Sequence, residues 1–214
     1  MIITYYGHSF FTLTTESGKV IAFDPYGDLA DYPKRLVKAD VCLISHHHFD
    51  HDGISCIQEG ATFIDQPDAA SPLKDVKLTG VRTWHDEKQG ALRGENTIFV
   101  VEAEGLRIGH AGDLGHLLSE KQIREIGPLD VLMVPVGGFF TIDAKQAHQV
   151  MEQLQPRLTI PMHYRTSWYQ EMKIAPLDNF LGEMKAEDTA CPLLRITSGD
   201  ISQRPAMLTL AIQP

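Results

Sequence analysis

The run His46-His47-His48-Phe49-Asp50-His51 limits what this chain can fold into more than any other feature of it. It comes one residue after residues 41–44, a short apolar run typical of a strand that is covered on both faces. Side chains at alternate positions of an extended segment lie on one side, so His46 and His48 can reach one ion, while the next Asp-His pair turns toward a second. Imidazole and carboxylate together suit zinc, manganese or iron. The run therefore predicts a metal site at the end of a buried strand.

A solvated histidine-rich loop, as in a purification tag, is the alternative explanation of this run. Such a loop has no reason to follow a buried strand or to place Asp50 at this spacing. Together with the run, most of the other histidines also lie at predicted strand ends or in the loops that follow them. The whole set is His46, His47, His48, His51, His85, His110, His116 and His163. Loops at strand ends carry functional groups in α/β proteins, because the rigid sheet fixes where they begin.

Apolar and β-branched runs predict a chain that is rich in strands. The expected strands are residues 2–6, 9–15, 20–23, 41–44, 80–84, 97–102, 106–110, 131–134, 157–160 and 207–212. Two capping boxes, Ser119 with Gln122 and Asp143 with Gln146, each predict the start of a helix. Residues 178–185 are a third candidate helix, which is less favoured because it contains a glycine. Strands that later alternate with helices indicate a mixed α/β protein with packed sheets and outer helices.

Length and charge narrow the class of protein further. The 214 residues fit one domain that spans positions 1–214. A net charge of −9 argues against nucleic acid as the main partner, since nucleic-acid binding usually needs a basic surface. The N-terminus does not resemble a signal peptide, and no apolar stretch is long enough to span a bilayer. The cysteines Cys42, Cys56 and Cys191 lack metal-type spacing, so a cytoplasmic, reducing location is expected.

The histidine run resembles the His-x-His-x-Asp-His signature of the metallo-β-lactamase superfamily. Three later landmarks follow in that family's order: His85 after a strand, Asp113 at the end of a His-Ala-Gly-Asp run, and His163 after Pro-Met. The resemblance covers nearly the whole chain. It implies the superfamily's fold, a four-layer αββα sandwich of two mixed sheets with outer helices and the metals at one edge.

The same resemblance implies two divalent metal ions, with Zn²⁺ as the first choice and Mn²⁺ or Fe²⁺ as alternatives. The implied ligands are His46, His48 and His85 for the first ion, Asp50, His51 and His163 for the second, and Asp113 for both. One bridging carboxylate can offset charge on both ions and fix their separation. The simpler alternatives are strand-end histidines that neighbouring groups satisfy, and an aspartate that serves a turn.

Shorter motifs narrow the resemblance to one branch of the superfamily. These motifs are Gly7-His8-Ser9, Phe23-Asp24-Pro25, Arg93-Gly94-Glu95-Asn96-Thr97 and Gly112-Asp113-Leu114. They are similar to those of bacterial metal-dependent hydrolases related to ascorbate-6-phosphate lactonases and, more distantly, to N-acyl-phosphatidylethanolamine phospholipase D. The motifs say little about the substrate.

Asp50, His8 and His110 are the candidate catalytic residues. Asp50 would bind metal and also orient the nucleophile. His8 and His110 could each donate to substrate or transfer a proton, or could be satisfied histidines near the sheet edge. Asp24 either serves a turn or, as the family implies, orients ligand imidazoles through their second nitrogens. His47 alternates out of the ligand face and is expected in an outer shell or exposed.

Several residues outside the ligand set have weaker patterns. His148 lies on a predicted amphipathic helix, where a structural or exposed position is expected. The segment Gly137-Gly138-Phe139-Phe140 either shapes the mouth of the site or forms a plain loop. The candidate contacts to an anionic group of a substrate are Arg93, Asn96 and Arg165.

These residues predict metal-assisted hydrolysis of a small ester, lactone or phosphodiester by a water held between the ions. The partner is then a small molecule, with an anionic one as an option, and the oligomeric state stays open. A nuclease of the same superfamily would need a basic surface. A flavodiiron-like redox protein would usually carry glutamate where His48 stands and would need a flavin domain. A metal-binding module without turnover is the third alternative.

Overall fold

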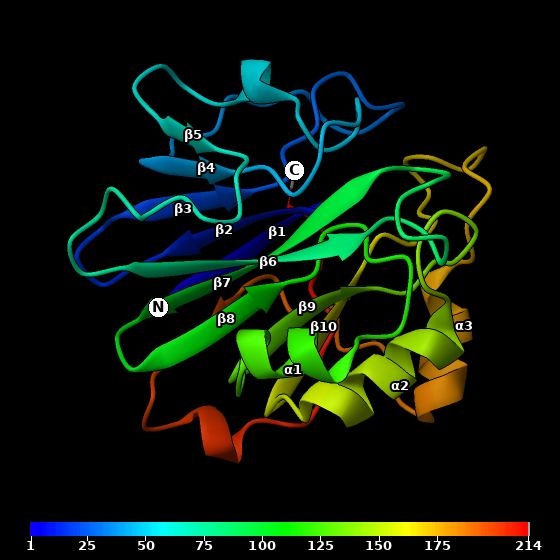
Figure 1. Ribbon diagram of the computed structural model, residues 1–214. Helices are drawn as coiled ribbons and strands as arrows, with labels where there is room; N and C mark the ends of the chain where they lie inside the picture. Colours follow the sequence, from blue (N-terminus) through cyan, green and yellow to red (C-terminus); the bar gives the residue numbers. More distant parts are fainter. Residues whose placement is uncertain (214) are drawn as a thin grey trace.

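The computed structural model describes residues 1–213 and contains two β-sheets packed face to face (Figure 1). The first sheet has the order β11-β1-β2-β3-β4-β5, with bounds Leu194–Arg195, Ile2–Gly7, Phe10–Thr14, Val20–Phe23, Val41–Leu43 and Thr62–Ile64. The second has the order β10-β9-β8-β7-β6, with bounds Leu158–Met162, Val131–Pro135, Leu106–His110, Glu95–Ala103 and Lys77–Trp84. This arrangement confirms the predicted sandwich of two mixed sheets.

The strand directions decide where the strands end. In the first sheet β1 and β3 both run antiparallel to β2, and β4 and β5 run parallel to β3. In the second sheet β6 and β8 both run antiparallel to β7, and β9 and β10 continue parallel to β8. The carboxyl ends of β1, β3 and β4 therefore share one edge of their sheet, as those of β6, β8, β9 and β10 do in theirs.

The main hydrophobic core lies between the two sheets. It combines Ile3, Phe11 and Leu43 of the first sheet with Phe99 and Val134 of the second. Each of these side chains is almost fully buried, and removal of such apolar surface from water is the main force that holds sandwiches together. The shared core supports the expectation of one domain over residues 1–214, which stays a prediction.

A second, smaller core covers the outer face of the first sheet. Here Phe10 and Cys42 pack against Tyr26, Tyr32 and Cys56, which come from the loops after β3 and β4. The 3₁₀ helix η1 (Ile54–Cys56) is the one helical element on this face among residues 1–213. Loops thus take the place of the outer α-helical layer that was expected over this sheet. Cys42 is buried.

The α-helices are α1 (Glu120–Ile126), α2 (Ala144–Leu154) and α3 (Leu177–Met184). They lie on the outer side of the second sheet, where α1 contacts β6 and α2 packs against α3 (Figure 1). Ser119 and Asp143 accept the backbone N–H groups of Gln122 and Gln146, and both glutamine side chains accept in return, so both predicted capping boxes are confirmed.

The predicted strands 207–212 and 157–160 both have wrong bounds. The expected strand 207–212 is not continuous: it makes only isolated bridges, from Met207 to Thr159 and from Leu210 to Cys191. The expected strand 157–160 extends to Met162 through Pro161, which β10 tolerates because it is the edge strand of its sheet. The short strands β5 and β11, and the second 3₁₀ helix η2 (Ile201–Gln203), were not expected.

Candidate metal centre

The candidate site lies where the carboxyl ends of same-direction strands meet across the two sheets. His8 follows β1, Asp24 follows β3, and the histidine run follows β4. From the second sheet, His85 follows β6, Asp113 comes after β8 and His163 comes after β10. Residues that are far apart in the sequence are therefore neighbours in space because each begins a loop at the same edge.

The first group of donors is His46, His48 and His85. Each offers one ring nitrogen, and these three nitrogens lie within 4.8 Å of one another. Nε2 of His46 is 3.1 Å from Nδ1 of His48. The alternation of the extended segment thus places both imidazoles on one side, as the sequence predicted.

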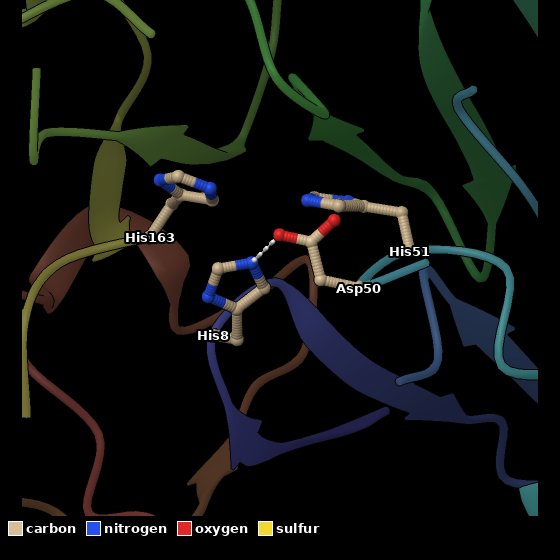
Figure 2. A group of neighbouring side chains, drawn as sticks. All are labelled: His8, Asp50, His51 and His163. Carbon is tan, nitrogen blue, oxygen red and sulfur yellow. Dashed lines mark hydrogen bonds and ion pairs between the residues drawn. The ribbon is translucent and has the colours of Figure 1, made fainter. Parts of the chain in front are cut away.

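The second group is His8, Asp50, His51 and His163, again within 4.8 Å, and Figure 2 shows these four side chains turned toward one another. Nε2 of His8 is 3.1 Å from Oδ2 of Asp50, the contact drawn as a dashed line. Three of the four were predicted as ligands of one ion. His8 joins them here, although the sequence suggested only a contact to substrate or a proton transfer.

Asp113 lies between the two groups. Its Oδ2 is 3.2 Å from Nε2 of His85, 3.3 Å from Nε2 of His163 and 3.9 Å from Nε2 of His46. Its Oδ1 is 3.2 Å from Nε2 of His51. One buried carboxylate therefore faces histidines of both groups, which is the position a bridging ligand needs.

Many polar atoms of this cluster are buried without a hydrogen-bond partner in the described part of the chain. They are Nε2 of His51, Nδ1 of His85, Oδ1 of Asp113 and both ring nitrogens of His163. Buried polar atoms without partners are costly and rare in folded proteins, so a concentration of them calls for a missing partner. Imidazole nitrogens and carboxylate oxygens are the donor set of Zn²⁺, Mn²⁺ and Fe²⁺ sites, and the cluster fits such a metal.

Asp24 lies behind the cluster and holds two of its histidines. Its Oδ2 is 2.9 Å from Nδ1 of His51 and accepts the hydroxyl of Ser45 at 2.6 Å, while Oδ1 accepts the Ser45 backbone N–H at 2.7 Å. Oγ of Ser45 is in turn 2.9 Å from Nδ1 of His46. Asp24 thus contacts the second nitrogen of one histidine directly and that of the other through Ser45, which is the geometry of an orienting acid.

The charges in the cluster are coupled. Burial would raise the pKa of Asp113, but His163 and His51 hold it well below its usual range. Burial would lower the pKa of His51, but Asp113 and Asp24 raise it well above its usual value. For Asp50, burial is likewise outweighed by the hydrogen bond from His8, so its pKa falls. These carboxylates are ionised at neutral pH, as ligands must be.

His8 is buried and has a left-handed backbone, with φ of 54°. Its carbonyl oxygen accepts the N–H of His163 at 2.8 Å and the hydroxyl of Tyr5 at 3.0 Å, while its ring contacts Asp50. Burial lowers the pKa of His8 to about 4, the nearby His163 adds to this, and Asp50 only partly opposes it. A neutral His8 with hydrogen on Nε2 can donate to Asp50. His8 therefore ties β1 to two of the candidate ligands.

His110 has no free ring nitrogen. Its Nε2 lies 2.9 Å from the carbonyl oxygen of Ser9, and its Nδ1 accepts the N–H of Gly112 at 3.2 Å. The ring stacks on Phe23 with centroids 5.1 Å apart. This arrangement favours a structural role, because a ring with both nitrogens engaged by the backbone cannot also exchange a proton with substrate. The predicted catalytic role of His110 has no support in the geometry.

An open cavity of about 610 Å³ leads to the cluster. Five of the candidate ligands line it: His48, Asp50, His85, Asp113 and His163. The other lining residues are Phe49, Arg93, Phe139, Phe140, Tyr169, Glu171, Met172 and Lys173. Of the two alternatives for residues 137–140, the lining by Phe139 and Phe140 favours the one in which the segment shapes the mouth of the site.

Among the predicted contacts to an anionic group, Arg93 reaches the cavity and the other two do not. The prediction for Asn96 is wrong: it is fully buried, donates to Thr83 and Ala111, and accepts the N–H of Asp113 at 2.9 Å. Asn96 therefore positions the Asp113 backbone. Arg165 is exposed and does not line the cavity.

Two further histidines lie away from the donor groups. His47 is exposed, as expected, and its ring nitrogens lie 3.3 Å from Asp52 and 3.0 Å from Asp65. His148 is half-buried on α2, with Nδ1 3.1 Å from Glu183.

Sequence reasoning missed three features of the site. Asp86, next to His85, accepts backbone N–H groups along the following loop. Ser45 connects Asp24 to His46. The segment 169–173 forms one wall of the cavity. Only Ser45 had a local signal, its place between a buried strand and the histidine run; the other two depend on how loops fold back.

Comparison with known proteins places the chain in a family. The family model for the beta-lactamase superfamily domain matches residues 2–163. A UPF0173 metal-dependent hydrolase of Carboxydothermus hydrogenoformans is 33% identical over 198 residues, covering 78% of this chain and 85% of that protein. Another, from Thermococcus onnurineus, is 31% identical over 191 residues, covering 77% and 84%.

A solved structure agrees with the fold and with the family. A Thermotoga maritima protein, provisionally assigned as a Zn-dependent hydrolase of the metallo-β-lactamase superfamily, is 36% identical, with a TM-score of 0.81 over 99% of both chains. The strand ends, the two donor groups and these matches agree. The chain belongs to the metallo-β-lactamase superfamily and, within it, to the UPF0173 family of metal-dependent hydrolases.

Proposed function

We propose that this protein hydrolyses a small ester, lactone or phosphodiester with two divalent metal ions, Zn²⁺ first and Mn²⁺ or Fe²⁺ as alternatives. The position of Asp113 carries the proposal, because its two carboxylate oxygens face histidines of both donor groups. A single metal site would need only one of these groups. Two groups that share one carboxylate are the arrangement that two-metal hydrolases use.

The proposed ligands are those that the family resemblance implied. His46, His48 and His85 hold one ion, Asp50, His51 and His163 hold the other, and Asp113 contacts both. When bound, such ions supply Lewis acidity and lower the pKa of a coordinated water toward neutrality. Asp50 has one oxygen fixed by His8 and is positioned to orient the attacking water. Asp24 and Ser45 keep His51 and His46 from rotating.

The partner in this proposal is a small molecule, with an anionic one as an option, because the cavity is of the size that such ligands fill. The resemblance to ascorbate-6-phosphate lactonases and to N-acyl-phosphatidylethanolamine phospholipase D makes lactones and phosphodiesters the first substrates to test. A nuclease is disfavoured by the net charge of −9. No helix in residues 1–213 is long and apolar enough to cross a membrane. We propose a cytoplasmic location, which the three free cysteines support.

The test is an activity screen of protein reconstituted separately with Zn²⁺, Mn²⁺ and Fe²⁺. Esters, lactones, phosphodiesters and phosphorylated sugars form the panel, and a gel-shift assay with DNA and RNA runs beside it. The expected result is turnover of at least one small-molecule class that Asp50→Ala abolishes. Fully loaded protein that turns over nothing would favour a metal-binding module, and tight nucleic-acid binding would favour the nuclease.

A further inference from the structure

We propose that the cavity selects amphipathic anions: an oxyanion, carboxylate or phosphate, binds Arg93, and an apolar group of the same molecule packs against Phe139 and Phe140. The inference rests on the proposed function, since it names the substrate class of the same site. It follows from four features of the cavity wall, namely an arginine without an acidic partner, a loop built to hold that arginine, exposed aromatic rings, and the charge of the cavity.

Arg93 is a half-buried cation at the cavity. Its Nη2 donates to the carbonyl oxygen of Phe139 at 3.2 Å, and its guanidinium lies over the Phe140 ring, 5.6 Å from the centroid. Within residues 1–213 no carboxylate lies at ion-pair distance from Arg93. A guanidinium has five N–H donors in a planar fork, so most of them stay available for an oxyanion.

The loop after β6 fixes where Arg93 begins. The buried carboxylate of Asp86 accepts four backbone N–H groups, from Lys88 at 2.7 Å, Gly90 at 3.1 Å, Leu92 at 3.0 Å and Arg93 at 2.7 Å. One side chain thus holds the whole turn, including the backbone of Arg93 itself. A binding group on a preorganised loop loses less entropy when it binds than one on a free loop. Asp86 is a positioning residue for Arg93.

Part of the cavity wall is aromatic and exposed. Phe139 has 62% of its surface exposed, and Phe49, which also lines the cavity, has 70%. The rings of Phe139 and Phe140 pack edge to face with centroids 4.7 Å apart. Phe139 also has a left-handed backbone, with φ of 63°, which costs a residue that is not glycine about 1 kcal/mol or more. An apolar ligand group that covers the exposed ring would remove this apolar surface from water.

The charge of the cavity favours anions once metal is bound. Three carboxylates, Asp50, Asp113 and Glu171, and two cations, Arg93 and Lys173, line it, for a net charge of −1. Two divalent ions would raise that charge to +3. A ligand that brings one or two negative charges is therefore attracted, and its apolar part has the phenylalanine wall to contact.

The experiment measures binding rather than turnover, by titration calorimetry on the Zn²⁺-loaded protein. The probes are benzyl phosphate and phenylacetate, each compared with its polar part, inorganic phosphate or acetate, and with benzyl alcohol. Both phosphate and acetate can reach the metals, so only the difference between paired probes reports on the wall. The variants are Arg93→Gln and Phe139→Ser. Their matched controls are Arg82→Gln, an arginine on β6 outside the cavity, and Phe63→Ser, an exposed phenylalanine on β5.

The expected result has two parts. Arg93→Gln weakens binding of both aromatic anions by about 10- to 100-fold, the range for a lost charge-assisted hydrogen bond. Phe139→Ser lowers the affinity for benzyl phosphate by about 3- to 10-fold through lost apolar contact and leaves the affinity for inorganic phosphate unchanged. The two control variants bind all of the probes with the affinity of the unchanged protein. Metal content and circular dichroism of each sample show that the site and the fold are intact, and Arg93→Lys and Phe139→Leu replace any variant that fails to fold.

Two outcomes would overturn the inference. One is equal affinity for benzyl phosphate and inorganic phosphate in the unchanged protein. The other is unchanged affinity for both anions in Arg93→Gln. Failure of the proposed function would give a different result: the protein would still bind aromatic anions selectively, but it would hydrolyse no ester, lactone or phosphodiester. The wall and the chemistry are thus tested separately.

Discussion

At the scale of single residues, the site is built from side chains that are costly in a folded protein without a ligand. His163 has a left-handed backbone, with φ of 51°, and both of its ring nitrogens are buried without a hydrogen-bond partner in residues 1–213. His8 and Asp24 also have positive φ. Strained residues and unpaired donors persist only where the surrounding structure or a ligand compensates for them, and here they surround one point.

Asp113→Ala should abolish turnover while the fold is kept. Two divalent ions held close together repel, and this carboxylate is the group that contacts both donor sets, so its loss should release one ion or separate the pair. The sheets should survive because Asp113 follows β8 and adds no apolar surface to the core. Metal analysis, hydrolysis rate and circular dichroism on one sample check this, with the exposed Asp28→Ala as control. A folded variant with both ions and near-normal turnover would show that Asp113 is not the bridge.

Asp24→Ala should weaken metal binding by about 10- to 100-fold while the ligands stay in place, because His51 and Ser45 lose the group that orients them. Chelator competition measures the affinity. Asp24→Asn is the companion variant, since it keeps an acceptor for the Ser45 backbone N–H and separates metal affinity from stability. Unchanged affinity in both variants would return Asp24 to the status of a turn residue.

At the scale of elements, the sequence predicts features that depend on neighbouring residues, such as helix starts, but not strand pairing between distant segments. The starts of α1 and α2 were predictable because a capping box involves residues three apart. Strands β5 and β11 and the isolated bridges of Met207 and Leu210 depend on partners far away in the chain. The same holds for the loops over the first sheet, where Tyr26 and Tyr32 fill the space that an outer helix was expected to cover.

The turn after β8, which carries Asp113, comes very close to Asn96 of β7 and to Ser45, which follows β4. Gly112 has φ of +55°, and a Cβ there would lie 2.3 Å from Oδ1 of Asn96 and 2.6 Å from Oγ of Ser45. Gly112→Ala should therefore lower the free energy of unfolding by about 1–3 kcal/mol and reduce metal retention.

Urea denaturation of the metal-free protein measures this effect. Gly182→Ala is the matched control: Gly182 lies within α3 with open space around its Cβ position, so alanine there should stabilise by about 0.5–1 kcal/mol. Gly112→Ala with unchanged stability and metal content would mean that the turn does not need its close approach.

At the scale of the whole molecule, the sandwich brings together residues from position 8 to position 163 at one edge. The sequence predicted the seven candidate ligands because they form short motifs in a known order, and the structure brings all seven together. It could not distinguish Arg93 from Asn96, since which of them reaches the cavity depends on Asp86 and on the packing of Asp113. Contacts of that kind appear only when the sheets are assembled.

Removal of metal should destabilise the whole protein. The donor groups come together only in the folded chain, so an ion that binds them stabilises that state, by about 4 kcal/mol at a thousand times its dissociation constant. For a chain of this size the melting temperature should fall by about 8–16 °C on chelation. Differential scanning fluorimetry with EDTA, followed by added Zn²⁺, measures the loss and its recovery. An unchanged melting temperature after verified metal removal would show that the cluster is stable without ions.

The central claim is that one edge of this sandwich holds two metal ions on seven side chains. Elemental analysis of protein reconstituted with Zn²⁺ or Mn²⁺ and freed of excess metal tests it most directly. The predicted result is about two ions per chain, falling to one or fewer in Asp113→Ala. A folded protein that retains no metal after reconstitution, with all seven residues intact, would contradict the account.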